Sequence, residues 1–444
     1  MRQLRKAGKR LTFAAGLAAA SVVAIVAGGV MAGGGPARAA TQPDQAGPHQ
    51  AGQDGAGQHG AGPNWVGTWE SAQVEPGTSG LSATGFTDQT VRDIIHTSAG
   101  GSEIRIRLSN VFGTAPLVVS DVHVALRQSG AATVPGTTRQ VLFDGRKSVT
   151  IPAGDREFSD PIRLKVGAET DLAVSIYFQQ PTGPTTWHPE ADSTNYYSTA
   201  GDHSADTAAT AYTNTDSSWY FLDGVDVVNP SVKGAVVTFG PSTTDGNAST
   251  PNANERYPDD LARRLLALPK GQQLSVLNAG ISGNELFADT GTDGQAAPAR
   301  FLRDAIDQTG VQAIIIWEGT NDILANPSLP LSDFTTVYQQ LIDVAHAHGI
   351  KVIGATLQPT EGTGGWTAEG NTLREEVNNW ILTSGAFDGT ADFSTVLEDP
   401  ANPAQLNPVY DSGDHLHPND AGYQAIADSI DLRLLTTPYR PRHR

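Results

Sequence analysis

The chain has 444 residues, which is more than one ordinary hydrophobic core accommodates, so two folded domains are expected. It carries 47 acidic and 29 basic residues, a formal net charge of −18, and a surface of that sign repels nucleic acid and anionic membranes. It contains no cysteine, so disulfides, a catalytic thiolate and thiolate metal ligands are excluded.

The first 39 residues have the three parts of a secretory signal peptide. Residues 1–10 (MRQLRKAGKR) are basic, residues 11–33 are apolar and rich in Ala and Gly, and ARA at 37–39 is a small-residue cleavage site. A retained membrane anchor is the alternative, but the apolar part leads directly into that site, which favours cleavage. Cleavage leaves 23 basic and 47 acidic residues, a net charge of −24. We therefore expect a secreted, extracellular protein with no stable membrane association and no nucleic-acid partner.

Two segments outside the expected domains have no pattern of a folded core. Residues 40–64 consist mainly of Gln, Gly, Ala and Pro with a loose Ala-Gly repeat, which predicts a disordered linker. Residues 437–444 (TPYRPRHR) form a basic tail.

Residues 65–231 read as a succession of short strands. Apolar and polar residues alternate in SEIRIRLSNVF, LVVSDVHVAL and TDLAVSIYF, and Gly, Pro, Asp and Asn clusters separate these segments. The pattern predicts an all-β domain, most simply a sandwich. Its Trp and Tyr clusters could line a sugar-binding face, although such residues in β domains mostly serve packing. His188, in TTWHPE, could reach across the domain interface.

Residues 232–436 alternate buried-type strands with amphipathic helices. The strands read GAVVTF, LSVLN, AIIIW, KVIGATL and GTADF, and the helices are expected near 255–268, 296–308, 332–348, 369–383 and 419–435. Strict alternation with continuously apolar strands predicts a parallel sheet with helices on both faces. Ligands of such sheets bind outside the carboxyl ends of the strands.

Polar and glycine-rich segments follow these strands and converge on that edge of the sheet. They read GPSTTDG, NAGISGN, EGTND, QPT and DSGDHLHP. A serine nucleophile needs a base, a group that orients the base, and donors aimed at the developing oxyanion. Ser242 can serve as nucleophile, and Asp414 and His417 are three residues apart, so Asp414 can hold the imidazole. Gly283 can offer an unobstructed backbone N–H and Asn321 a side-chain amide.

These four blocks, in this order, resemble those of the SGNH (GDSL) hydrolases: a GDS-type serine block, a glycine block, GxND and DxxHP. The resemblance covers the chain from about residue 232 to 436 and implies a flavodoxin-like three-layer α/β/α fold with strand order 2-1-3-4-5. It implies Ser242 as nucleophile, His417 as base and Asp414 as its support. It also implies an oxyanion hole made of the Ser242 N–H, the Gly283 N–H and the Asn321 amide.

The serine block departs from the family pattern at two positions. The family usually has Asp where this chain has Pro241, and an aliphatic residue where it has Thr243. Proline removes one carboxylate and one N–H, but the oxyanion donor of this loop is the N–H of Ser242 itself. The residue that Pro241 restricts is Gly240, which tolerates the restriction. We therefore expect Pro241 to be tolerated.

Three other interpretations compete with a serine esterase of short-acyl substrates. His415, His417 and Asp414 could form a metal site, but the rim carries no further well-placed histidine or cysteine. The hydrolase domain could be dormant within a carbohydrate-binding or structural protein, or the substrate could be a lipid ester. Asp245 is expected to shape the loop, and the sequence does not decide whether Glu318 faces the cleft.

The sequence thus predicts a secreted two-domain esterase, a β-sandwich followed by an SGNH-like hydrolase domain. It predicts ester hydrolysis through an acyl-enzyme without cofactor or metal, on small-molecule or polysaccharide esters, and it assigns no oligomeric state. The sandwich-plus-hydrolase layout of some carbohydrate esterases favours acetylated polysaccharides by analogy of architecture. Because all predicted catalytic residues lie within 232–436, that part alone is expected to keep some esterase chemistry.

Overall fold

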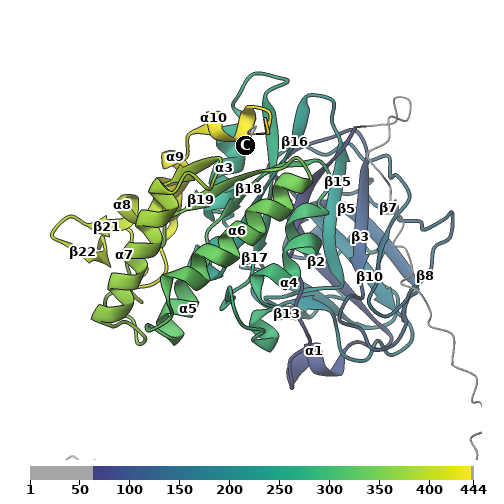
Figure 1. The fold of residues 1–444 in the computed structure, drawn as a ribbon. Helices are drawn as coiled ribbons and strands as arrows, with labels where there is room; N and C mark the ends of the chain where they lie inside the picture. Colours follow the sequence, from purple (N-terminus) through teal and green to yellow (C-terminus); the bar gives the residue numbers. More distant parts are fainter. Residues whose placement is uncertain (1–63, 442–444) are drawn as a thin grey trace, which may run out of the picture. The chain divides into compact units, whose positions relative to one another are not determined.

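The computed structural model describes residues 64–441, so the predicted signal peptide, the linker up to residue 63 and the last three residues of the basic tail lie outside the described residues. The described residues belong to one compact unit (Figure 1). We keep residue 231/232 as a proposed division of that unit into an N-terminal and a C-terminal region. Between residues 64 and 441, no helix combines the length and the apolar character needed to cross a bilayer.

The N-terminal region is built from antiparallel strands, as predicted. The two larger sheets have the orders β1-β15-β3-β9 and β13-β12-β2-β10-β5-β6, with β7 paired to β5, and β4-β8 and β11-β14 form two-stranded sheets. The elements are β1 (Trp65–Glu70), α1 (Gly80–Thr84), β2 (Gln89–Thr97), β3 (Ile104–Ser109), β4 (Leu117–Val119), β5 (Asp121–Ser129), β6 (Ala132–Thr133), β7 (Arg139–Gln140), β8 (Val149–Ile151), β9 (Arg156–Phe158), β10 (Thr170–Phe178), β11 (Trp187–His188), β12 (Asn195–Ala200), β13 (Asn214–Asp216), β14 (Trp219–Tyr220) and β15 (Leu222–Val228). Burial alternates in β4 and at the start of β5, as the period of two in the sequence predicts, whereas most residues of β1, β2, β3, β10 and β15 are buried on both faces.

The C-terminal region contains the predicted parallel sheet, in the order β17-β16-β18-β19-β20. Counted along the chain this is 2-1-3-4-5, which confirms the implied fold. Its strands are β16 (Val232–Gly240), β17 (Gln273–Gly280), β18 (Val311–Ile316), β19 (Lys351–Ala355) and β20 (Gly389–Ala391). Val236, Val237 and Phe239 of the interior strand β16 are completely buried, because helices cover both faces of the sheet.

The predicted helices follow the strands, two of them with altered form, and the short helices α2, α5 and α8 and a β-hairpin are additional. The α-helices are α2 (Ser242–Asp245), α3 (Tyr257–Leu266), α4 (Ala297–Phe301), α5 (Thr320–Ala325), α6 (Leu331–Ala347), α7 (Ala368–Thr383), α8 (Phe393–Leu397), α9 (Asp420–Ser429) and α10 (Leu432–Thr436), and the hairpin β21 (Glu398–Asp399) and β22 (Asn402–Leu406) follows α8. The helix expected at 296–308 continues after α4 as a π-helical turn, Leu302–Ile306. The helix expected at 419–435 is interrupted at Ile430, where the backbone is extended and Asp431 caps α10.

The two regions are in direct contact through the edge strand β1, which packs against β17 and β16. The Gly67 N–H donates to the Thr309 carbonyl at 2.9 Å, and the Val276 N–H donates to Ser98 Oγ at 3.1 Å. A Cβ at Gly67 would stand 2.8 Å from a terminal methyl group of Leu277, so a larger residue would require that side chain to shift.

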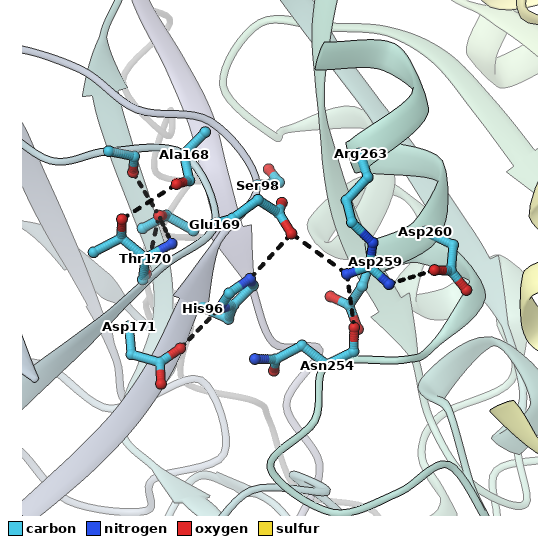
Figure 2. A network of polar contacts seen from close by, with 12 residues as sticks. His96, Ser98, Ala168, Glu169, Thr170, Asp171, Asn254, Asp259, Asp260 and Arg263 are labelled. Atoms are coloured by element: carbon cyan, nitrogen blue, oxygen red, sulfur yellow. Dashed lines mark hydrogen bonds and ion pairs between the residues drawn. The ribbon is translucent and has the colours of Figure 1, made fainter. Parts of the chain in front are cut away.

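A chain of charged side chains crosses the same interface (Figure 2). His96 of β2 contacts Asp171 at 2.7 Å and Glu169 at 3.4 Å, and Glu169 contacts Arg263 of α3, also at 3.4 Å. Burial lowers the pKa of His96, but its hydrogen bonds to Asp171 and Glu169 outweigh burial and raise the pKa to about 9. His96 is therefore positively charged at neutral pH and belongs to an ion-pair network between the regions.

Candidate active site

The buried strand β16 delivers Ser242 to the carboxyl edge of the sheet through a tight turn. A Cβ at Gly240 would stand 2.4 Å from the Trp317 carbonyl oxygen, so the strand must leave the sheet through glycine. Pro241 follows with φ −88°, and its carbonyl accepts the N–H groups of Thr244 and Asp245 at 2.9 Å each. The turn therefore continues as the four-residue helix α2, which begins with Ser242.

Ser242, His417 and Asp414 form one hydrogen-bonded chain. Ser242 Oγ lies 2.7 Å from His417 Nε2, and His417 Nδ1 lies 2.6 Å from Asp414 Oδ2. Because a carboxylate oxygen only accepts, Nδ1 carries the proton and Nε2 is left to accept the Ser242 O–H. The structure thus brings together the three residues that the sequence assigned to nucleophile, base and support.

The carboxyl group of Asp414 is held in its charged form. Its Oδ1 accepts the N–H groups of Leu416 and His417 at 2.9 and 2.8 Å. Burial raises the pKa of Asp414, but these backbone bonds and the His417 ring outweigh burial and lower the pKa to about 2. Asp414 is therefore a carboxylate at neutral pH, oriented towards the imidazole.

The loop that carries His417 is stabilised by its own side chains. Asp411 accepts the N–H groups of Gly413 and His415, and Asn419 caps α9 by accepting the Gly422 N–H. These bonds close the turn over Asp414–His417 immediately before the helix begins.

The predicted oxyanion donors lie on two further loops that are bonded to each other. The amide of Asn321 donates to the Asn284 carbonyl at 2.9 Å, and Asp322 accepts the Leu286 N–H at 3.0 Å. Gly283 has φ +78°, a conformation that glycine adopts readily. The N–H groups of Ser242 and Gly283 donate no hydrogen bond to any described residue, and the Asn321 amide keeps a second N–H.

The effect of Pro241 can be predicted from this turn. In Pro241→Asp the new side chain would stand at the N-cap of α2, where carboxylates are favourable acceptors, while the Ser242 N–H stays in place. We expect kcat for a small ester to change by less than about tenfold. Steady-state kinetics of both proteins measure this change. A rise of about a thousandfold would show that the natural loop is impaired.

The second histidine of this loop is paired separately. His415 Nδ1 lies 2.6 Å from Asp411 Oδ2, so each histidine has its own aspartate rather than sharing Asp414. The three residues of the alternative metal site therefore do not converge on one point: His415 is paired with Asp411, and His417 with Asp414. Within the described part of the chain, no group of three or more His, Asp or Glu side chains is arranged to hold a metal ion.

Sequence reasoning missed a buried arginine beneath these loops. The Arg300 guanidinium donates to the carbonyls of Gly240 and Ala279 at 3.1 and 2.8 Å and to Asn284 Oδ1 at 2.8 Å. It thereby joins the serine block to the glycine block. Nothing in the sequence distinguishes Arg300 from the other arginines of its helical segment, so only the structure reveals this role.

Two neighbours of the GxND block are part of the interior. Trp317 is completely buried, and Glu318 is 1% exposed rather than facing the cleft. Burial raises the pKa of Glu318 well above its ordinary value. Neither carboxylate oxygen of Glu318 has a hydrogen-bond partner among the described residues.

An open cleft of ≈ 440 Å³ adjoins the Gly283 loop. One wall comes from the N-terminal region and the other from the glycine block and the turn after it. The cleft is lined by Gly77, Thr78, Ser79, Ser82, Trp187, Pro189, Glu190, Ser282, Gly283, Thr292 and Asp293. Both regions therefore contribute to the surroundings of the candidate active site.

Residues 238–425 match the model of the GDSL-like Lipase/Acylhydrolase family. The search of curated proteins found no match.

Similar solved structures include three esterases and lipases. The lipase/acylhydrolase from Enterococcus faecalis is 20% identical, with 47% of this chain and 99% of that chain covered and a TM-score of 0.35. The GDSL-like lipase from Bacteroides thetaiotaomicron is 20% identical, with 45% and 87% covered and a TM-score of 0.34. A family two carbohydrate esterase from Clostridium thermocellum, solved with cellohexaose, is 13% identical, with 82% and 96% covered and a TM-score of 0.36.

Proposed function

We propose a specific activity for this protein. The premise is that residues 238–425 match the GDSL-like lipase/acylhydrolase family, so the protein is a carboxylic ester hydrolase. The protein is a secreted serine esterase that hydrolyses short-acyl esters through an acyl-enzyme. The observation that carries this proposal is the hydrogen-bonded chain from Ser242 Oγ through His417 to Asp414. The proposed secretion rests on the signal-peptide pattern of residues 1–39.

Acylation begins when Ser242 Oγ attacks the ester carbonyl carbon. His417 Nε2 accepts the Ser242 proton, and Asp414 stabilises the imidazolium that forms. The carbonyl oxygen becomes an oxyanion, for which the Ser242 N–H, the Gly283 N–H and the second N–H of Asn321 are the available donors. The bond to the alcohol oxygen then breaks, His417 returns the proton to that oxygen, and the alcohol leaves.

Deacylation uses the same groups with water in place of the alcohol. His417 accepts a proton from the water, whose oxygen attacks the acyl carbon on Ser242. The ester bond to Oγ breaks, the proton returns to Oγ and the carboxylic acid leaves. The chain is thereby restored to its starting state, with no redox change and no cofactor in the step.

The cleft beside Gly283 supports a polar alcohol as the group that leaves. Its lining combines the hydroxyl groups of Ser and Thr residues and the carboxylates of Glu190 and Asp293 with the aromatic face of Trp187. The carboxylates of Glu190 and Asp293 disfavour an anionic alcohol such as a phosphate ester. A cleft of this size and polarity suits an acetylated sugar better than a long hydrocarbon chain.

A substrate series tests the proposed function. We expect kcat/KM on p-nitrophenyl esters to fall about tenfold or more from acetyl to octanoyl, and acetylated xylan to release acetate. Trp187→Ala should lower kcat/KM on acetylated xylan about tenfold but change p-nitrophenyl acetate turnover by less than about twofold. Tyr177→Ala, outside the cleft, is the matched control. A preference for octanoyl esters would instead assign a lipid-ester hydrolase.

A further inference from the structure

The loop that carries Ser242 is bonded to the N-terminal region along one stretch of residues. The cross-region hydrogen bonds join His188 to Asp245, Glu190 to Asn247, Ala191 to Arg256, and Asp192 and Thr194 to Asn252. Helix α2 has four residues, too few for a helix to be stable by itself. The position of α2 is therefore determined by its neighbours.

His188 is almost completely buried, with 1% of the residue exposed. It lies on β11, paired with β14, and its ring packs against Trp219 at 5.4 Å between centroids. Ring Nδ1 lies 2.7 Å from the Ala72 carbonyl, and Nε2 lies 3.1 Å from Asp245 Oδ1 and 3.2 Å from the Glu190 carbonyl.

Both ring nitrogens of His188 therefore face acceptors. Carbonyl and carboxylate oxygens only accept, so the arrangement is satisfied when both nitrogens carry protons and the ring is an imidazolium. Burial lowers the pKa of His188, but the Asp245 carboxylate and the two carbonyls outweigh burial and raise it. The result is a buried ion pair between the two regions, whose loss would leave one charge uncompensated.

Asp245 passes this contact on to the active-site loops. Its Oδ2 accepts the Ser282 N–H at 3.1 Å, and its carbonyl accepts the Asn278 amide at 3.1 Å. A Cβ at Gly280 would stand 2.1 Å from the Asp245 N, so α2 lies directly against the end of β17. Asp245 is thus bonded to the residue that precedes Gly283, and it lies one helical turn from Ser242.

We propose that His188 is a positioning residue of the active site: it fixes Asp245 and thereby the relative position of the Ser242 N–H and the Gly283 N–H. This inference rests on the proposed function. His188 touches neither substrate nor reacting atoms, and it acts through Asp245. The N-terminal region is on this account a structural part of the catalytic centre.

The test compares His188→Gln and Asp245→Asn in the full chain, with p-nitrophenyl acetate as substrate. Each variant should lower kcat about 10- to 100-fold with KM changed less than about twofold, because misplacement by an ångström can cost about a hundredfold. The rate of labelling by a fluorophosphonate should fall in parallel. The double variant should lose no more than the worse single variant, since both act on one ion pair.

His96→Gln is the matched control. His96 is half-buried at the interface and also ion-paired, but its partners are Asp171 and Glu169, and among the described residues no hydrogen bond joins it to the Ser242 loop. The His96→Gln substitution should lower the melting temperature of the protein and leave kcat unchanged. The inference is overturned if folded His188→Gln or folded Asp245→Asn keeps wild-type kcat, or if His96→Gln loses as much kcat. A wild type that hydrolyses no ester and takes no label would overturn the proposed function itself.

Discussion

Ser242→Ala is expected to lower kcat about 10⁶-fold, because the nucleophile of a serine hydrolase acts as one unit with its base. Ser242 Oγ lies 2.7 Å from His417 Nε2. Alanine lacks this oxygen, so no group next to the imidazole can accept the acyl group. A weak residual rate from the oxyanion donors is expected to remain. Steady-state hydrolysis of p-nitrophenyl acetate measures the loss, and a fluorophosphonate should label the wild type only.

Thr243→Val is the matched control for this substitution. Thr243 is the next residue of α2, it is 1% exposed, and its hydroxyl has no hydrogen-bond partner among the described residues. Removing that hydroxyl should leave both kcat and labelling near the wild-type values. If Ser242→Ala kept a tenth of the wild-type rate, another group would be the nucleophile.

Residues 232–444 expressed alone are expected to lose at least about 100-fold in kcat/KM, or to fail to fold. The described contacts lead to this expectation, which is opposite to the one drawn from the sequence. Without the N-terminal region, Leu277 loses its contact with Gly67, and Asp245 loses the imidazolium of His188. Apolar surface of the sheet and a buried carboxylate would then face water.

Circular dichroism, thermal melting and fluorophosphonate labelling of the fragment measure this effect. Co-expression with residues 40–231 as a separate chain should restore labelling, because the contacts between the regions are non-covalent. A soluble fragment with wild-type kcat/KM would show that the N-terminal region serves substrate binding or localisation only.

The sequence by itself determined the order of elements and the set of candidate residues. Continuous apolar strands alternating with amphipathic helices allow a parallel sheet, and the carboxyl ends of parallel strands meet at one edge. Ser242, Asn321 and His417 follow three different strands, so the sequence predicted that they would meet. The order of elements depends on periodicity along the chain, which a sequence shows directly, whereas the roles of these residues were implied by the resemblance to the SGNH (GDSL) hydrolases.

Tertiary structure decided which of several equivalent residues form each contact. His415 and His417 are two residues apart in one loop, but only His417 lies 2.7 Å from Ser242, while His415 is paired with Asp411. Gly280 and Gly283 both read as turn glycines. The structure shows that Gly280 allows α2 to approach β17, whereas Gly283 has the positive φ.

The contacts between the regions also lay beyond the sequence. His188 and Asp245 are 57 residues apart in the sequence and share no motif or period. Arg300 lies on a helix whose sequence is typical of a surface helix, yet its guanidinium connects the ends of two strands. Such contacts depend on how a β-rich region is placed against the edge strand of a parallel sheet. Placement of this kind is set by the shapes of two surfaces, such as Gly67 against Leu277, and leaves no periodic signal in either segment.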